Sequence, residues 1–209
     1  MINGEKCLRE AVAAIYSNDL FSTDLYLKGG QALKISGVNT ERLSTDIDMS
    51  SPKAIDNADK FFQQLESCLE GHFNSLGFHL FDFYKKKKPE VKKDSTPDFW
   101  SGWAIEFKLI ESSKKGDDIE SKRRKAFKPF GPQKTSKISI EISEYEYCES
   151  FEFIKVDGVE VRSYSRVSLV LEKLRALCQH HPSYQNSPEN PSPRSRDLYD
   201  ISLIYEKMI

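Results

Sequence analysis

A pair of glycines followed by two closely spaced aspartates restricts the fold of this chain more than any other feature. The apolar run at residues 25–27 ends at the turn that contains Gly29 and Gly30, and Asp46 and Asp48 follow after a short loop. Side chains at positions i and i+2 of a strand point to the same face of a sheet. We therefore expect a short strand at 46–50 that presents both carboxylates together, with its apolar residues buried behind them.

Two carboxylates on one face predict a cation. Side by side, Asp46 and Asp48 repel each other unless a positive charge lies between them. Mg²⁺ prefers one or two carboxylates together with the phosphates of a substrate, so the pair indicates a site for Mg²⁺ or Mn²⁺. A D-x-D pair alone is also compatible with an acidic surface strand that has no catalytic role, and this is the alternative to a metal site.

The two segments together resemble a known family. Gly-Gly-x-Ala-Leu at 29–33 and Arg-x-Ser-x-Asp-x-Asp at 42–48 are similar to motifs of the AbiEii/AbiGii toxin nucleotidyltransferases, members of the DNA polymerase β-like superfamily. The resemblance implies an α/β (α+β) fold, a mixed sheet flanked by helices with a helical C-terminal segment. It also implies a metal-dependent enzyme that transfers a nucleoside monophosphate from an NTP to an acceptor hydroxyl. By this resemblance the nucleotide-binding residues of the first half of the chain are Gly29, Gly30, Gln31, Arg42 and Ser44.

A third carboxylate is expected from a strand beside the D-x-D strand. Glu141 is the leading candidate because it lies on the polar side of the clearest alternating strand, at 137–143. Glu106, in a similar apolar-acid-apolar pattern, stays open as the alternative. Asp46, Asp48 and Glu141 are thus the predicted metal ligands, since two-metal nucleotidyl transfer uses several acidic groups.

The C-terminal region carries a second resemblance. Residues 171–177 are similar to the family helix that contributes a lysine, and Arg-Asp-x-Tyr-Asp at 196–200 is similar to the family's R-D-x-Y-D motif. The resemblance implies that Lys173 clamps the triphosphate, that Asp197 orients Lys173 or a metal-bound water, and that Arg196 contacts the nucleotide. The predicted catalytic set is then Asp46, Asp48, Glu141, Lys173 and Asp197. The alternative for the R-D-x-Y-D motif is structural: its charged residues could lie at the N-terminus of a helix, where the helix dipole favours charge, without any role in a site.

Charge is distributed unevenly along the chain. The net charge is −1, yet residues 84–137 hold sixteen Lys/Arg against eight Asp/Glu. A basic segment of this kind suits a triphosphate or RNA, and a tRNA 3′ end is the acceptor that the resemblance suggests. A solvated surface is the alternative. Nearby aromatic residues could stack on bases or fill a core: Phe83, Tyr84, Phe99, Trp100 and Trp103.

Several broader expectations follow. The domain prediction is a core at 1–164, with a basic insertion around 84–137, and a helical segment at 165–209 that completes the active site. No apolar run reaches membrane-spanning length, and four dispersed cysteines suit reduced thiols in a cytoplasmic protein. The resemblance adds a separately encoded antitoxin as partner. A catalytically weak nucleotide- or RNA-binding protein, and a transferase with a protein or small-molecule acceptor, remain open.

Periodicity and turn signals predict the order of elements. We expect helices over 5–17, 31–36, 54–69, 168–180 and from 195 onward. We expect strands over 25–28, 46–50, 77–84, 104–110, 137–143, 151–156 and 159–164. The last two strands should form a hairpin at Asp157-Gly158, and the lysine run 85–88 should lie in a loop.

Overall fold

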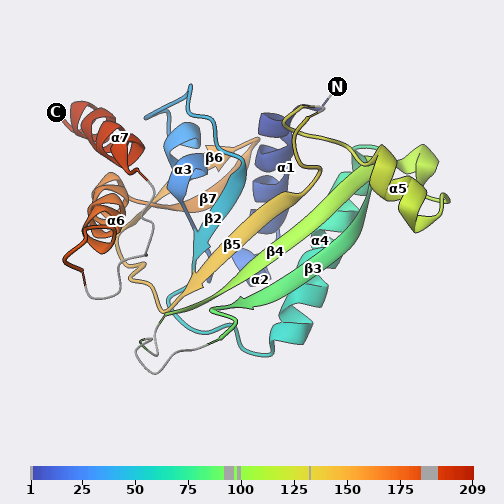
Figure 1. Cartoon of the computed structure of the whole chain (residues 1–209), viewed down its shortest axis with the longest axis horizontal. Helices are drawn as coiled ribbons and strands as arrows, with labels where there is room; N and C mark the ends of the chain where they lie inside the picture. The colour runs from blue at the N-terminus through green and yellow to red at the C-terminus, as the bar shows by residue number, and fades with distance from the viewer. Residues whose placement is uncertain (1, 92–96, 98–99, 132, 185–192) are drawn as a thin grey trace.

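A seven-stranded mixed sheet organises the chain (Figure 1). The computed structural model describes residues 2–91, 97, 100–131, 133–184 and 193–209. The strand order is β3-β4-β5-β2-β1-β7-β6. The strands are β1 (Tyr26–Lys28), β2 (Asp46–Ser50), β3 (Phe78–Lys88), β4 (Ser101–Glu111), β5 (Ile138–Glu144), β6 (Phe151–Val156) and β7 (Val159–Tyr164).

Seven α-helices and a short 3₁₀ turn are found in the described part of the chain. They are α1 (Gly4–Tyr16), α2 (Asp19–Ser22), α3 (Gly29–Ile35), α4 (Ala58–Ser75), α5 (Ile119–Lys125), α6 (Arg166–Gln179) and α7 (Ser195–Glu206), with the 3₁₀ turn at Ser112–Lys114. None of these helices combines the length and hydrophobicity needed to span a bilayer.

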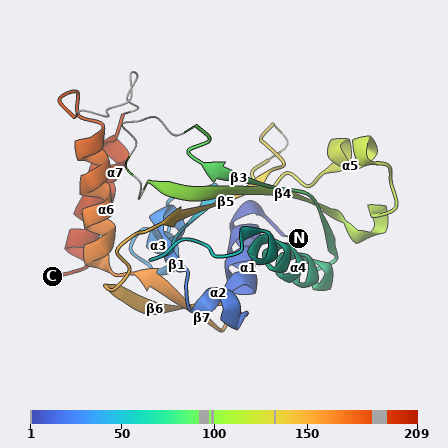
Figure 2. The same ribbon diagram turned by 90° about the horizontal axis from the view of Figure 1, so that it is seen from below.

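Helices α1 and α4 cover one face of the sheet (Figure 2). The face of β5 that meets them carries isoleucines, while the alternate positions are polar, as expected for a strand with one buried side. The helices contribute regularly spaced apolar side chains to the same core. Fully buried members include Leu8, Val12 and Ile15 of α1, Phe62, Leu65, Leu69 and Phe73 of α4, and Ile47, Met49, Ile138 and Ile140 of the sheet.

The opposite face of β5 and β2 presents the predicted acidic residues. The two strands are parallel, and Asp48 pairs in register with Glu141 while Asp46 pairs with Ser139. On the far side of β5, Ala104 of β4 is opposite Glu141. Since Ile47 and Met49 are fully buried, the expected alternation of β2 is confirmed. Helices α6 and α7 stand beside this face at the β1 side of the sheet (Figures 1 and 2).

The structure confirms the α/β class and the predicted hairpin of β6 and β7, but the loop predicted for the lysine run is wrong. Residues 85–88 belong to β3. Lys85 lies over the ring of Phe62, and Lys87 lies over the ring of Trp103. The alkyl stems of alternate lysines can cover apolar surface while the ammonium groups stay hydrated, so a lysine run is compatible with a strand.

The predicted basic insertion around 84–137 contains one of the inner strands of the sheet. Strand β4 lies between β3 and β5, so this segment is part of the core architecture as well as a carrier of charge. Helices α6 and α7 follow the last strand, β7, as the prediction for 165–209 requires. The functional division at 164/165 stays a prediction.

A buried carboxylate holds the ends of β3, β4 and β5 together. Glu144 is only 2% exposed. It accepts hydrogen bonds from the Ile55 backbone N–H at 3.0 Å, the Ser101 hydroxyl at 2.6 Å and the Trp103 indole N–H at 2.9 Å, and it pairs with Lys87 at 2.5 Å. Burial alone would raise the pKa of Glu144, but these four donors outweigh burial and lower the pKa below its ordinary value.

We expect Glu144→Ala to destabilise the protein by about 3–5 kcal/mol at pH 7, because it leaves four donors without an acceptor. A lowered pKa adds stability at neutral pH that is lost in acid, so the difference from wild type should shrink as the pH falls. Urea denaturation at several pH values measures both effects. Glu149→Ala, at an exposed position, serves as control; equal losses for the two variants would contradict the assignment.

Candidate active site

The Gly-Gly turn and the D-x-D strand are in direct contact. Gly29 has a φ of +64°, a conformation that side chains with a Cβ adopt rarely. A Cβ on Gly29 would lie 2.1 Å from Asp48 Oδ2. Glycine is therefore required here twice, for its backbone conformation and for the approach of the carboxylate.

The second glycine contacts the loop that precedes β2. A Cβ on Gly30 would lie 2.7 Å from the hydroxyl oxygen of Ser44 and 2.8 Å from Nε of Arg42. The Ser44 hydroxyl donates to Asp46, at 3.2 Å to the backbone oxygen and 3.3 Å to Oδ1. The structure thus brings together the glycines, the arginine, the serine and the aspartates of the two predicted motifs.

Asp48 is held in an electrostatically unfavourable position. Its pKa is raised from 3.8 to about 7. Burial is the largest cause, followed by the charges of Asp46 and Glu172, while Lys28 opposes the shift and Glu141 adds to it. A carboxyl group whose pKa is raised by burial and by neighbouring carboxylates is typical of a functional site. A cation bound there would remove the repulsion.

Lys28 and Glu172 belong to this site but were missed in the sequence. Lys28, only 6% exposed, pairs in register with Asp48. Its ammonium group lies 3.0 Å from Glu172 of α6 and donates to the Ser143 hydroxyl at 3.1 Å. The available signals were a lysine placed between a buried apolar run and the glycine turn, and an acidic residue directly before Lys173.

The residues of the C-terminal motifs form a buried ion network. Lys173, 5% exposed, lies 3.1 Å from Asp197 and 2.8 Å from Asp200. Asp200 is completely buried and also pairs with Arg42. The network therefore connects α6 and α7 to the arginine beside Gly30.

Two residues of the R-D-x-Y-D motif differ in their environment: Asp200 is buried and Arg196 is exposed. Asp200 belongs to the motif but not to the predicted site, and its ion pair with Arg42 connects α7 to the first half of the chain. Arg196 is exposed on α7; the arginine that contacts Asp197, at 3.3 Å, is Arg194.

Both candidates for the third carboxylate lie on the open face. Glu141 is directly opposite Asp48 across one strand pair, whereas Glu106 is opposite Ser139 and is therefore two strands from Asp46. Each is paired with a lysine: Glu141 with Lys88 at 2.6 Å, and Glu106 with Lys137 at 2.5 Å. The register favours Glu141 over Glu106, and its role stays a prediction.

The residues on this face suit a divalent cation that arrives with its substrate. Among the described residues, no group of three His, Cys, Asp or Glu side chains forms a complete metal cage. Mg²⁺ does not require such a cage, because it binds through one or two carboxylates plus phosphate oxygens. Asp46 and Asp48 are the predicted source of those carboxylates, and burial together with neighbouring acidic groups raises the pKa of Asp48 despite the charge of Lys28.

Two buried polar atoms beside the glycine turn also lack partners. Gln31 Oε1 and Arg42 Nε are among the buried side-chain atoms with no hydrogen-bond partner in the described structure. An unpaired buried donor or acceptor is costly, so such atoms indicate a place where a ligand can bind. Both residues were predicted to bind nucleotide.

The basic segment carries less free charge than its composition indicates. Ion pairs engage Arg123 with Asp82, Lys125 with Asp117, and Lys86 with Glu90. Helix α5, which carries the densest run of basic residues, lies at the end of the molecule away from α6 and α7 (Figure 1). Lys92, Lys93 and Phe99 lie outside the described residues.

The structural class is defined by a mixed α/β sheet that carries paired aspartates on its open face, beside a glycine turn. Comparison of the sequence with known proteins then defines the family. Residues 10–209 match the AbiEii nucleotidyl transferase toxins of type IV toxin–antitoxin systems. The chain belongs to this family and is a nucleotidyltransferase. No curated protein matches the sequence.

Solved structures include distant matches. A proposed nucleotidyltransferase from H. pylori is 20% identical, with 97% of this chain and 67% of that chain covered and a TM-score of 0.49. A nucleotidyltransferase-like antigen from Paracoccidioides brasiliensis is 16% identical, with 95% and 76% covered and a TM-score of 0.47. ANT(2″)-Ia in complex with adenylyl-2″-tobramycin is 13% identical, with 98% and 89% covered and a TM-score of 0.42.

We expect Asp48→Asn to stabilise the metal-free protein by on the order of 2 kcal/mol at pH 8. The folded-state pKa of about 7 exceeds the ordinary 3.8, so ionisation of Asp48 destabilises the folded state above about pH 4 and does so fully above pH 7. The gain should therefore shrink as the pH falls from 8 to 5. Urea denaturation in EDTA measures it, and a loss of stability, or a gain independent of pH, would contradict the assignment.

Proposed function

We propose that this nucleotidyltransferase is Mg²⁺-dependent (with Mn²⁺ as a substitute) and transfers a nucleoside monophosphate from an NTP to the terminal hydroxyl of a tRNA 3′ end. The observation that carries the proposal is the contact of Asp48 with Gly29, which places a carboxylate of raised pKa directly against the turn predicted to receive phosphates. The role would be growth inhibition or phage defence in the cytoplasm, controlled by the antitoxin that a type IV system implies.

Asp46, Asp48 and Glu141 would hold the metal, with Glu141 released from Lys88. When bound, Mg²⁺ would neutralise negative charge on the phosphate oxygens. Glu141 would accept the proton of the attacking hydroxyl, whose oxygen bonds to the α-phosphorus as pyrophosphate leaves with the electrons of the broken P–O bond. Lys28, beside Asp48 and Glu172, would balance the charge of the acidic group.

The triphosphate would lie along the Gly29-Gly30 turn. Neither glycine has a side chain to prevent close approach, and the unpartnered Arg42 Nε–H can donate to a phosphate oxygen. Gln31 Oε1 can only accept, so its partner would be a hydroxyl or amino group of the nucleotide. We propose that Ser44 contributes its hydroxyl and that Arg196 reaches the outer phosphates. Lys173 would contribute positive charge and, with Asp197, hold Asp200 and thereby Arg42 in place.

A tRNA acceptor is supported by the family resemblance. Incubation with each labelled NTP, Mg²⁺ and total tRNA tests it. Label on RNA would support the proposal, whereas label on the protein itself, or on a small molecule, would identify a different acceptor and contradict the tRNA assignment. Absence of label with every NTP would favour a binding protein of low activity.

We expect Asp46→Ala and Asp48→Ala each to reduce nucleotidyl transfer by more than about a hundredfold while the fold stays intact, because each removes a carboxylate that balances the cation. Transfer of labelled nucleotide measures activity, and circular dichroism measures folding. Asp59→Ala is the control, since Asp59 is 97% exposed and pairs with Lys85 near the start of α4. Retention of a tenth of wild-type activity in both site variants would contradict the assignment.

We expect Arg42→Met to weaken NTP binding by roughly tenfold or more, the magnitude of one charged hydrogen bond. Asp200 keeps its pair with Lys173 at 2.8 Å, so most of the fold should survive. Calorimetry with NTP and Mg²⁺ measures the affinity. Arg9→Met, which removes a surface pair with Asp157, is the control, and unchanged affinity in Arg42→Met would exclude Arg42 from the nucleotide site.

A further inference from the structure

A large cavity with aromatic walls opens beside the proposed third carboxylate. Its volume is about 800 Å³, within the range of roughly 300–1,000 Å³ that is typical of small-molecule sites. It lies where β4 begins and β5 ends, and it extends toward α6. The residues that matter to the argument are Trp100, Trp103, Tyr145, Tyr147, Glu141 and Arg175.

The cavity and the glycine turn lie on opposite sides of Asp48. The turn follows β1, which pairs with one edge of β2, and Glu141 is on β5, which pairs with the other edge. Glu141 contributes to the wall of the cavity. A nucleotide held at the turn therefore leaves the cavity free for the second substrate, with Glu141 between the two.

The cavity combines a fixed wall with exposed rings. The Trp103 indole donates to buried Glu144 at 2.9 Å, and its ring lies 4.8 Å from the ring of Phe62 and 4.7 Å from the Lys87 ammonium group, so Trp103 is fixed. The surface available for stacking therefore comes from the other rings of the lining. Tyr145 and Tyr147 are 51% and 66% exposed. Tyr145 has a φ of +58°, an uncommon conformation for an aromatic residue that is often found at functional sites.

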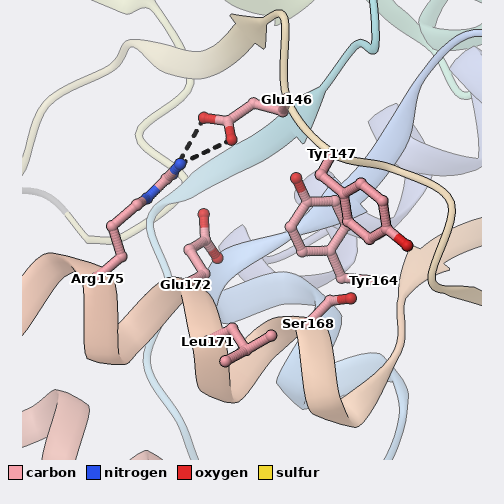
Figure 3. A pocket seen from close by; sticks show the side chains of 7 residues that line it. All are labelled: Glu146, Tyr147, Tyr164, Ser168, Leu171, Glu172 and Arg175. Carbon is pink, nitrogen blue, oxygen red and sulfur yellow. Dashed lines mark hydrogen bonds and ion pairs between the residues drawn. The ribbon is translucent and has the colours of Figure 1, made fainter.

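Arg175 and Glu146 close the side of the cavity nearest α6. Figure 3 shows a smaller neighbouring pocket, which shares Glu146, Tyr147 and Arg175 with the cavity. In it, Arg175 reaches from α6 to both carboxylate oxygens of Glu146, at 2.8 and 3.0 Å. The two charges compensate each other. The other charged groups of the lining are also paired, Glu141 with Lys88 and Glu144 with Lys87. The aromatic surface is therefore the main feature that a ligand can use, which favours a planar group.

We propose that this cavity binds the unpaired terminal base of the acceptor RNA by stacking. The inference rests on the proposed function, because it identifies the part of the acceptor that the site recognises. Aromatic side chains stack on the π-face of any base, so the cavity would select an unpaired nucleotide without selecting a sequence. The hydroxyl of that nucleotide would then face Glu141, while a base within a duplex could not enter.

The protein contains a reporter for this test. The sequence has two tryptophans, and both line the cavity. We expect a single-stranded RNA hexamer, without NTP, to quench tryptophan fluorescence. A hexamer with an abasic 3′ nucleotide and a blunt RNA duplex should not. Quenching by NTP with Mg²⁺ but not by the hexamer would assign the cavity to the donor base and overturn the proposal.

A variant tests the same inference through binding and turnover. Tyr147→Ala should weaken hexamer binding and raise the KM for RNA, each by roughly tenfold, with little change in the KM for NTP. Tyr205→Ala is the control, because Tyr205 is 63% exposed on α7 and does not line the cavity.

The outcomes separate this inference from the proposed function. Labelled RNA with unquenched tryptophans, or with a Tyr147→Ala variant equal to wild type, would overturn the cavity assignment and leave the proposed function in place. No labelled RNA with the wild-type protein would instead contradict the tRNA acceptor and, with it, the role of the cavity.

Discussion

The repulsion among partly buried carboxylates beside Asp48 is the constraint around which the rest of the structure is arranged. Such a group is tolerated only because β2 is anchored from behind by buried Ile47 and Met49 and lies between β1 and β5. The neighbouring cation Lys28 is shared with Glu172, so it lowers the repulsion without cancelling it. The fold thus holds the Asp48 carboxylate where its charge is unfavourable, and the divalent cation of the proposed function would relieve this repulsion.

The second half of the chain is connected to this position by charge as well as by packing. Asp200 on α7 is shared by Lys173 of α6 and by Arg42 of the loop before β2. A completely buried carboxylate needs a cation as partner, and Asp200 has two, so it joins Arg42 to Lys173. The position of Arg42 beside Gly30 therefore depends on two helices more than 120 residues away in the sequence, and the C-terminal helices are part of the candidate site.

Local patterns in the sequence predicted the features that depend on neighbouring residues. The bounds of β2 and of the β6–β7 hairpin follow from alternation and turn signals, and Asp46 and Asp48 project together for the same reason. The partners of charged side chains depend on tertiary contacts that no local pattern contains. Lys28 and Glu172 were missed for this reason. The lysines of 85–88 read as a loop because polarity suggested one, while their pairing with α4 residues was not visible.

The contact between Gly29 and Asp48 also determines what a substitution at position 29 would do to the protein. Any residue but glycine at position 29 would push a Cβ into the Asp48 carboxylate and would occupy a left-handed conformation. The obstacle is mainly the end of a side chain rather than backbone, so the sheet can persist while the acidic pair is displaced. If Asp48 acts as the proposed function requires, a single codon change at position 29 would therefore remove activity while the sheet persists.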